Sequence, residues 1–362
     1  MYMKKIFFYI IFVFANQFAS AQEQCLSGSE SNKQLLENLK EAQANSPIAM
    51  KISEKYDLLK KTEAGVCTEC ERAPRRPLPS LSPNKTYFKE ECVQAAAQIK
   101  TSSNEVSCPS GKNGFHKQCF SRTFFKYQNA VISEFYKCIR RTQNFPITPE
   151  ALFEMYSLES GFKPYYSNPG GTGMGQLTGI FIKDLHMKHR GRPVIESIAQ
   201  STHEDCETAK IIAEKDLKKE PSLNNKCSFI QAGEGLERNI LYSLMGLANS
   251  WNKDIEPLLK NYIKKYERDP QILDVQYKAL INSYGPGGRA AARASIRRLS
   301  KLAPKDYVKA MSRPLMTEDG DNLNVYTNNM ANKQKQIVQF FIEPMKSEFK
   351  KNGARACLEY MF

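Results

Sequence analysis

Residues 157–161 read Ser-Leu-Glu-Ser-Gly, and residues 168–177 read Asn-Pro-Gly-Gly-Thr-Gly-Met-Gly-Gln-Leu. Upstream of them, four residues at spacing i, i+3, i+4 and i+7 share one face of a predicted helix: Leu152, Met155, Tyr156 and Glu159. The helix is predicted to begin at Thr148-Pro149-Glu150 and to end at Gly161. The dense glycines that follow predict a sharp turn or a close approach of the backbone to a ligand. We therefore expect a partly buried helix that leads into a glycine turn.

Glu159 is the residue of this stretch that suggests chemistry. It lies on the apolar face and in the last helical turn, where burial and the helix dipole both disfavour a negative charge. Both effects raise the pKa of a carboxyl group, and a raised pKa suits a general acid near neutral pH. The alternative is a structural glutamate that extends into solvent from a helix end. The turn is not a phosphate-binding loop, because no Gly-Lys-Ser or Gly-Lys-Thr follows it.

These residues resemble the catalytic motif of the lytic transglycosylase domain and its goose-type lysozyme relatives. The family pattern is a Glu-Ser pair, a short gap and then Gly-Leu-Met-Gln-Leu. Glu159-Ser160 matches the pair, and residues 173–177 match the second part. Met174 takes the Leu place and Gly175 the Met place, which alters a contact to the sugar in this resemblance. The resemblance covers about residues 146–312.

Three downstream segments resemble the same family more loosely. Asn239-Ile240 is similar to its Asn-Ile helix. Residues 279–287 are similar to its Ala-Leu-x-x-Tyr-Asn-x-Gly-Pro-Gly segment, with Asn282 at the Tyr place and Ser283 at the Asn place. Tyr284 stands two positions late and is expected to take the role of the missing Tyr. Tyr307-Val308 is similar to the later Tyr-Val helix.

The resemblance implies a mainly α fold (α+β, lysozyme-like) with a small β-hairpin or glycine turn after the catalytic helix. It implies cleavage of the β-1,4 bond between N-acetylmuramic acid and N-acetylglucosamine, with Glu159 as the single catalytic acid and with peptidoglycan glycan strands as the partner. No cofactor or metal is expected. The residues expected to bind the substrate are Ser160, Met174, Gly175, Gln176, Asn239, Asn282, Tyr284 and Tyr307.

Two alternatives remain open. A hydrolytic lysozyme shares the first step but activates water, which needs a second polar group such as Asp184. A non-catalytic glycan-binding module is favoured by Gly175 and by the altered Tyr-Asn segment, whereas Glu159 opposes it.

The N-terminus predicts export. Lys4 and Lys5 precede an apolar run at residues 6–14 that is too short to span a bilayer, and residues 19–21 fit a cleavage site. We expect a signal peptide at residues 1–21 and a periplasmic or secreted protein without a stable membrane span. An uncleaved anchor is the alternative reading.

Cysteines and charge agree with export. The chain has ten cysteines, an even number that suits disulfides, and Cys206 and Cys227 are a candidate pair. A zinc site at Cys67 and Cys70 is the alternative. The formal charge of +14 falls to +12 without Lys4 and Lys5. Such a protein suits an anionic polymer or surface, but no motif indicates nucleic acid. The oligomeric state is not assigned.

After the signal peptide, the predicted organisation has five parts. Residues 22–70 form a helical segment that Ser46-Pro47 interrupts, and residues 71–85 form a proline-rich linker. Residues 86–145 form a Cys-rich helical region, which includes a helix at about 120–141 and a Gly-rich loop before it. The catalytic domain spans 146–347, with an insertion at 186–235. The tail is 348–362. A basic helix at 289–301 is either a solvated face or a binding site for peptide carboxylates.

Overall fold

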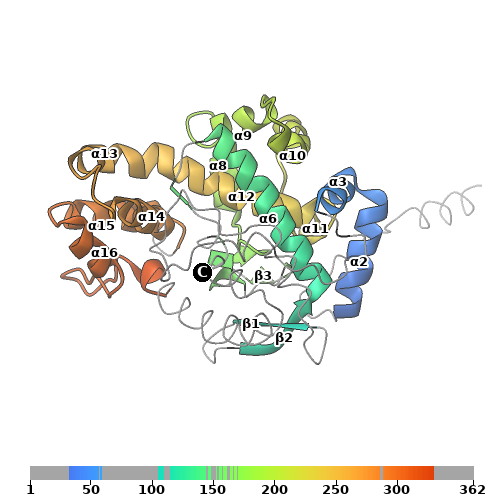
Figure 1. The fold of residues 1–362 in the computed structure, drawn as a ribbon, viewed down its shortest axis with the longest axis horizontal. Helices are drawn as coiled ribbons and strands as arrows, with labels where there is room; N and C mark the ends of the chain where they lie inside the picture. The colour runs from blue at the N-terminus through green and yellow to red at the C-terminus, as the bar shows by residue number, and fades with distance from the viewer. Residues whose placement is uncertain are drawn as a thin grey trace, which may run out of the picture.

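The computed structural model describes residues 32–56, 58, 105–109, 115–143, 146–147, 152, 155–156, 158–160, 164–165, 167–168, 170–285 and 288–329. This part of the chain is mainly helical, with two short β-hairpins, which confirms the predicted class (Figure 1). The predicted signal peptide, linker, C-terminal tail and Cys67–Cys70 site lie outside the described residues. No helix in the described ranges combines the length and the apolar character needed to cross a bilayer.

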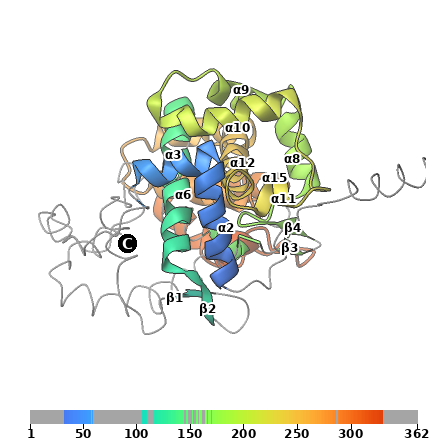
Figure 2. The same ribbon diagram turned by 90° about the vertical axis from the view of Figure 1, so that its right-hand side faces the viewer.

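Helix α12, Gly235–Ser250, lies at the centre of the fold, and all of its residues are buried. Figure 2 looks nearly along this helix and shows the other helices around it. It packs against α6 (Arg122–Thr142), α8 (Gly179–His186) and α11 (Cys227–Ile230). A helix covered on all sides is usually apolar all round. The polar residues of α12 therefore need partners inside the protein, and one of these partners is the glycine turn.

The N-terminal segment is the predicted helical hairpin. Helix α2 (Asn32–Asn45) ends before Ser46, whose hydroxyl caps α3 (Pro47–Lys55) by accepting from the Ala49 amide. The predicted apolar faces of both helices are buried in the core. Their buried residues are Leu35, Leu39, Ala42, Ile48, Ile52 and Tyr56. Buried Glu134 on α6 holds the hairpin, because it accepts from Lys55 Nζ at 3.0 Å and from Tyr56 Oη at 3.2 Å.

The segment before α6 differs from the prediction. Strands β1 (Glu105–Pro109) and β2 (Phe115–Ser121) pair antiparallel, where the sequence suggested a Gly-rich loop. The predicted helix at 120–141 is confirmed as α6.

The predicted insertion at 186–235 is a helical layer over α6. It contains α9 (Arg192–Ala199), the 3₁₀ turn η1 (Glu204–Cys206), α10 (Glu207–Lys218) and α11. A disulfide joins Cys206 to Cys138 on α6. The suggested pairing of Cys206 with Cys227 is therefore wrong, because Cys206 faces α6 and not its own neighbours in sequence.

The C-terminal helices form a second lobe, seen at the left of Figure 1. Helix α12 continues through a π-helical turn, η2 (Trp251–Ile255), in which Trp251 is buried in the core. The lobe then comprises α13 (Glu256–Lys265), α14 (Ile272–Asn282), α15 (Gly288–Leu299) and α16 (Pro304–Met311). A last helical turn at 325–329 packs back toward the centre of the molecule, because Tyr326 meets Gly285 and Tyr284.

Candidate functional site

Glu159 lies at the end of the helical segment predicted from the sequence. Residues 152, 155–156 and 158–159 are helical, and Leu152, Met155 and Tyr156 are completely buried. Glu159 continues the same face and keeps part of its surface exposed to solvent. The amide and hydroxyl of Ser160 both donate to the Tyr156 carbonyl, at 3.1 and 3.2 Å. The carboxyl group is thus carried by an anchored helix end and still reaches solvent.

Burial raises the pKa of Glu159 from 4.5 to about 7, and the nearby Tyr326 hydroxyl opposes this rise. No cation in the described part of the chain contributes to the shift. The Tyr326 hydroxyl is buried beside this carboxyl group and forms no hydrogen bond of ordinary geometry among the described residues. A carboxyl group with these neighbours is protonated in a large fraction of molecules near neutral pH, as a proton donor requires.

The glycine turn is a tight loop closed by two backbone hydrogen bonds. Strands β3 (Ser167–Asn168) and β4 (Gly171–Thr172) pair, and Thr172 and Leu177 then exchange two bonds of 3.0 Å. Inside the loop, Gln176 has a φ of 50° and donates from its side chain to the Gly173 carbonyl at 2.7 Å. The side-chain NH₂ group of Gln176 therefore stabilises the turn through this hydrogen bond.

Asn239 on α12 anchors this turn through two hydrogen bonds. Its Oδ1 accepts from the Gly175 amide at 2.7 Å, and its Nδ2 donates to the Thr172 carbonyl at 2.8 Å. Gly173 has a φ of 75°, and a Cβ there would lie 2.2 Å from Asn239 Nδ2. Asn239 is completely buried. It is therefore a positioning residue for the turn and not a direct contact for a ligand.

Tyr284, at the end of α14, closes the turn from the other side. Its hydroxyl donates to the Gly175 carbonyl at 2.6 Å, and its ring packs edge-on against Phe181 of α8. A Cβ on Gly175 would lie 2.0 Å from Ser243 Oγ and 3.0 Å from Tyr284 Oη. Burial, and then the nearby Glu159 carboxyl, raise the pKa of Tyr284 well above its usual value. The structure thus brings Glu159, Gly175, Gln176 and Tyr284 together.

Three of the predicted substrate contacts are core residues instead. Met174 is completely buried, and its sulfur accepts from Gln128 Nε2 at 3.3 Å. Asn282 is buried and donates to the Leu323 carbonyl at 2.9 Å. Tyr307 is completely buried, with its ring 5.8 Å from that of Tyr262. Their side chains are enclosed by protein, so they position other residues and do not meet a ligand in this structure.

Asp184, the suggested second carboxylate, is engaged in ion pairs. It pairs with Arg190 at 3.1 Å and with Arg289 at 2.6 Å. Arg289 also approaches Asp254 in the π-helical turn, at 3.2 Å. The two arginines occupy its oxygens, which makes it a structural link between α8, η2 and α15.

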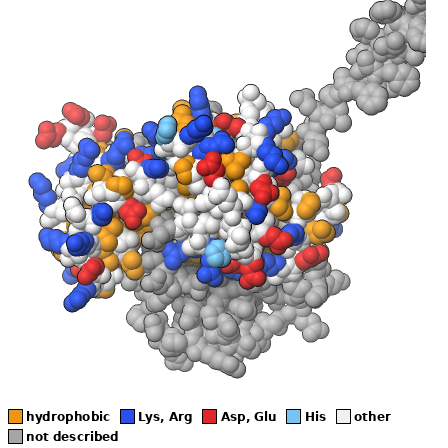
Figure 3. Space-filling view, turned by 90° about the horizontal axis from the view of Figure 1, so that it is seen from above, with side chains coloured by type: hydrophobic (Ala, Val, Ile, Leu, Met, Phe, Trp, Pro, Cys, Tyr) orange, Lys and Arg blue, Asp and Glu red, His pale blue; other side chains and the backbone are white. Residues whose placement is uncertain are grey.

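The predicted basic helix is α15. Arg289 and Arg293 lie at its η2 side and pair with Asp254, whereas Arg297 and Lys301 are exposed and form no ion pair within the described residues. Figure 3 shows Lys and Arg side chains spread over the left-hand lobe, with acidic side chains among them. The first half of the helix is therefore structural, and only its second half is available to a partner.

Tyr326 is the site residue that the sequence interpretation missed. Two features hold it in place: Gly285, where a Cβ would lie 2.2 Å from the Tyr326 ring, and Asn324, which is completely buried. Asn324 donates to the Met311 and Arg313 carbonyls at 2.9 and 2.7 Å and accepts from the Leu315 amide at 2.7 Å. The only signal in the sequence was a tyrosine within an asparagine-rich segment, Asn322 to Asn329.

The described residues offer no metal centre. No group of three or more His, Cys, Asp or Glu side chains among them is arranged to hold an ion. His203 lies beside η1, but the sulfur of Cys206 belongs to the disulfide.

Comparison with protein-family models, curated proteins and solved structures finds no match to this chain.

Proposed function

We propose that this protein is a lysozyme-like, peptidoglycan-cleaving enzyme that acts as a lytic transglycosylase on the bond between N-acetylmuramic acid and N-acetylglucosamine. One observation carries the proposal: a partly exposed carboxyl group with a pKa of about 7 ends a buried helix beside a glycine turn. Tyr284 and Tyr326 flank this group, and no basic side chain among the described residues neutralises it. The motif resemblance at residues 159–177 supplies the substrate class.

In this mechanism Glu159 works twice. The protonated carboxyl group donates its proton to the glycosidic oxygen as the bond to the muramic acid C1 breaks. The carboxylate then removes the proton of the 6-hydroxyl of the same sugar, whose oxygen bonds to C1 and forms the 1,6-anhydro product. One carboxyl group therefore serves as acid and then as base, and the protons balance without water.

The hydrolytic alternative needs a group that activates water. In inverting glycosidases a second carboxylate has this role. The ion pairs of Asp184 with Arg190 and Arg289 weigh against this residue as the base. The single-acid route therefore has more support than the lysozyme route.

The test is the chemistry of the product. Purified protein is incubated with peptidoglycan, and the released muropeptides are identified by mass spectrometry. Anhydro ends are expected, and Glu159→Gln should abolish release while it preserves the fold. Reducing ends would replace the proposal with a lysozyme. If the wild-type protein released nothing from either acetylated or deacetylated substrate, the enzyme proposal would be rejected in favour of a glycan-binding module.

The proposal also places the protein outside the cytoplasm, in the periplasm or secreted. The Cys138–Cys206 disulfide favours an oxidising compartment. Residues 1–21 supply the expected export signal, and labelling of the mature N-terminus after export would test the cleavage after Ala21.

A further inference from the structure

A polar cavity of about 290 Å³ lies between α2 and the segment that leads into α12. One wall is formed by the second half of α2 and by Ser46, and the other by residues 225–238. None of the residues that line it belongs to the Glu159 site. The two walls are far apart in the sequence, so the cavity exists only in the folded chain.

Hydrogen bonds between the walls fix the shape of this cavity. Asn38 Oδ1 accepts from the Tyr165 hydroxyl at 2.6 Å and from the Ala232 amide at 3.1 Å. The Ser46 hydroxyl donates to the Gly233 carbonyl, and the Gly233 amide donates to buried Glu237 at 2.9 Å. A cavity held in this way is pre-formed, as ligand sites usually are.

Four amide side chains face this cavity with unused hydrogen-bonding groups. Asn38 Nδ2 and the side-chain amides of Asn45, Asn225 and Gln231 form no hydrogen bond within the described residues. Each amide offers both donors and acceptors, which match the N–H and C=O groups of a peptide. The described lining contains no aromatic ring on which a sugar face would stack. The wall chemistry therefore fits a peptide better than a glycan.

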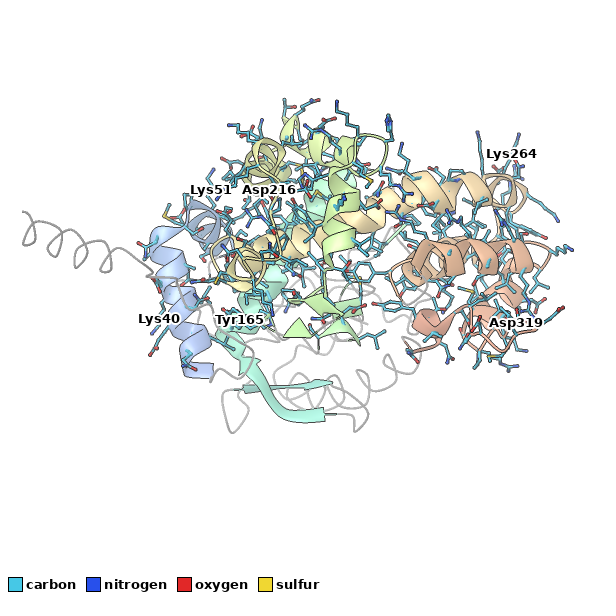
Figure 4. The ribbon with its side chains drawn as sticks, turned by 180° about the vertical axis from the view of Figure 1, so that it is seen from behind. Lys40, Lys51, Tyr165, Asp216, Lys264 and Asp319 are labelled. Atoms are coloured by element: carbon cyan, nitrogen blue, oxygen red, sulfur yellow. A yellow bond between two sulfur atoms is a disulfide. The ribbon has the colours of Figure 1, made fainter. Side chains whose placement is uncertain are left out.

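The charges around this cavity favour a cation. Arg238 is buried, but Asp216 neutralises it through bonds of 2.8 and 3.0 Å, and Glu234 also accepts from it. Lys215 pairs with Glu234 at 2.6 Å. Figure 4 marks Asp216 inside the helical body. Glu41 adds an exposed carboxylate at the rim without an ion pair in the described ranges, so one negative charge is left over.

We propose that this cavity binds a short peptide that carries a free amino group. The peptide groups bond to the amide side chains, and the ammonium group faces Glu41. If the proposed function holds, the ligand is the stem peptide of peptidoglycan, and only this identification rests on that function. Helix α12 connects this cavity to the Glu159 site. Arg238 lines the cavity, and the next residue, Asn239, hydrogen-bonds to the glycine turn.

Isothermal titration calorimetry on the full-length chain tests this inference. The probe is a synthetic stem tetrapeptide with a free lysine amine, and the matched control is the same peptide with that amine acetylated. We expect acetylation to weaken binding about fivefold, as does Glu41→Gln, because one exposed ion pair is lost. The double variant Asn225→Ala with Gln231→Ala should weaken it about tenfold. Glu54→Gln, an exposed glutamate of α3 away from the cavity, should leave the affinity unchanged.

Three results would overturn the inference: no binding of the tetrapeptide, equal affinity for the acetylated peptide, or an equal loss with Glu54→Gln. The experiment is independent of cleavage. Binding of the peptide without release of muropeptides would support the peptide site and contradict the proposed function. Release of muropeptides without binding of the peptide would support the proposed function and contradict the peptide site.

Discussion

The Tyr284 hydroxyl donates a 2.6 Å hydrogen bond to the Gly175 carbonyl and thereby joins the end of α14 to the glycine turn. These are two of the positions at which the chain departs from the transglycosylase pattern. The contact relates them, because a side chain at position 175 would collide with Ser243 and crowd Tyr284. Tyr284, which stands two positions late, and Gly175, which replaces the methionine of the pattern, are therefore sterically matched.

Gly175→Ala should destabilise the protein. The new Cβ would lie 2.0 Å from Ser243 Oγ, inside a turn that has no room to move. We expect a loss of about 1–3 kcal/mol in the free energy of unfolding, measured by denaturant titration. Release of muropeptides should fall as well, since the turn shifts relative to Glu159.

Two controls define the cause of this loss. Gly179→Ala, in the first turn of α8, meets nothing within 4 Å and should be neutral or slightly stabilising. Ser243→Ala removes the clashing oxygen, so Gly175→Ala should cost less in that background. Equal costs in both backgrounds would show that Ser243 is not the obstacle.

The pH dependence of stability should reveal Glu159. Its pKa is about 7 in the folded protein and 4.5 when unperturbed. The folded state therefore binds more protons between these values, and stability falls as pH rises from 4.5 to 7. Glu159→Gln should remove this fall and exceed the wild-type stability above pH 7 by up to about 3 kcal/mol. Chemical denaturation at pH 4 and pH 8 measures it. A constant difference between the two proteins at both values would contradict the raised pKa.

Tyr326→Phe should raise the pKa of Glu159 further, because the neighbouring Tyr326 hydroxyl lowers it. The basic limb of the activity profile, where Glu159 loses its proton, should move to higher pH, and NMR titration of labelled Glu159 should show the same shift. Tyr307→Phe is the matched control, since Tyr307 is also a buried tyrosine but does not contribute to the pKa of Glu159. A profile that moves equally in both variants would remove Tyr326 from the site.

Local periodicity predicted the helices and the position of Glu159. The apolar face through Leu152, Met155 and Tyr156 is buried, and Ser46-Pro47 separates α2 from α3 as expected. These features depend on residues that are close in sequence. Helix spacing and capping chemistry act over one or two turns, so the sequence states them directly.

Long-range partners were beyond the sequence interpretation. Cys206 pairs with Cys138 because η1 packs on α6, whereas the sequence offered Cys227 only as a candidate partner at the other end of the insertion. Tyr326 reaches Glu159 only because Gly285 accepts its ring and Asn324 fixes the chain before it. Tyr307 carried the motif match, yet its side chain packs on Tyr262. Such contacts follow from the packing of whole helices, which motif spacing does not encode.

Removing the Cys138–Cys206 disulfide should weaken one layer of the protein. The bond links residues 68 positions apart, so its loss increases the entropy of the unfolded chain. Cys138→Ala with Cys206→Ala should lower the free energy of unfolding by up to about 4 kcal/mol, and alanine avoids new buried hydroxyl groups. Hydrogen exchange should accelerate in η1 and α10, which pack on α6, more than in α14 and α16 of the other lobe. Uniform acceleration throughout would mean that both lobes unfold as one unit. Muropeptide release at 25 °C should change little, because neither cysteine contacts the glycine turn, and a complete loss would contradict this separation.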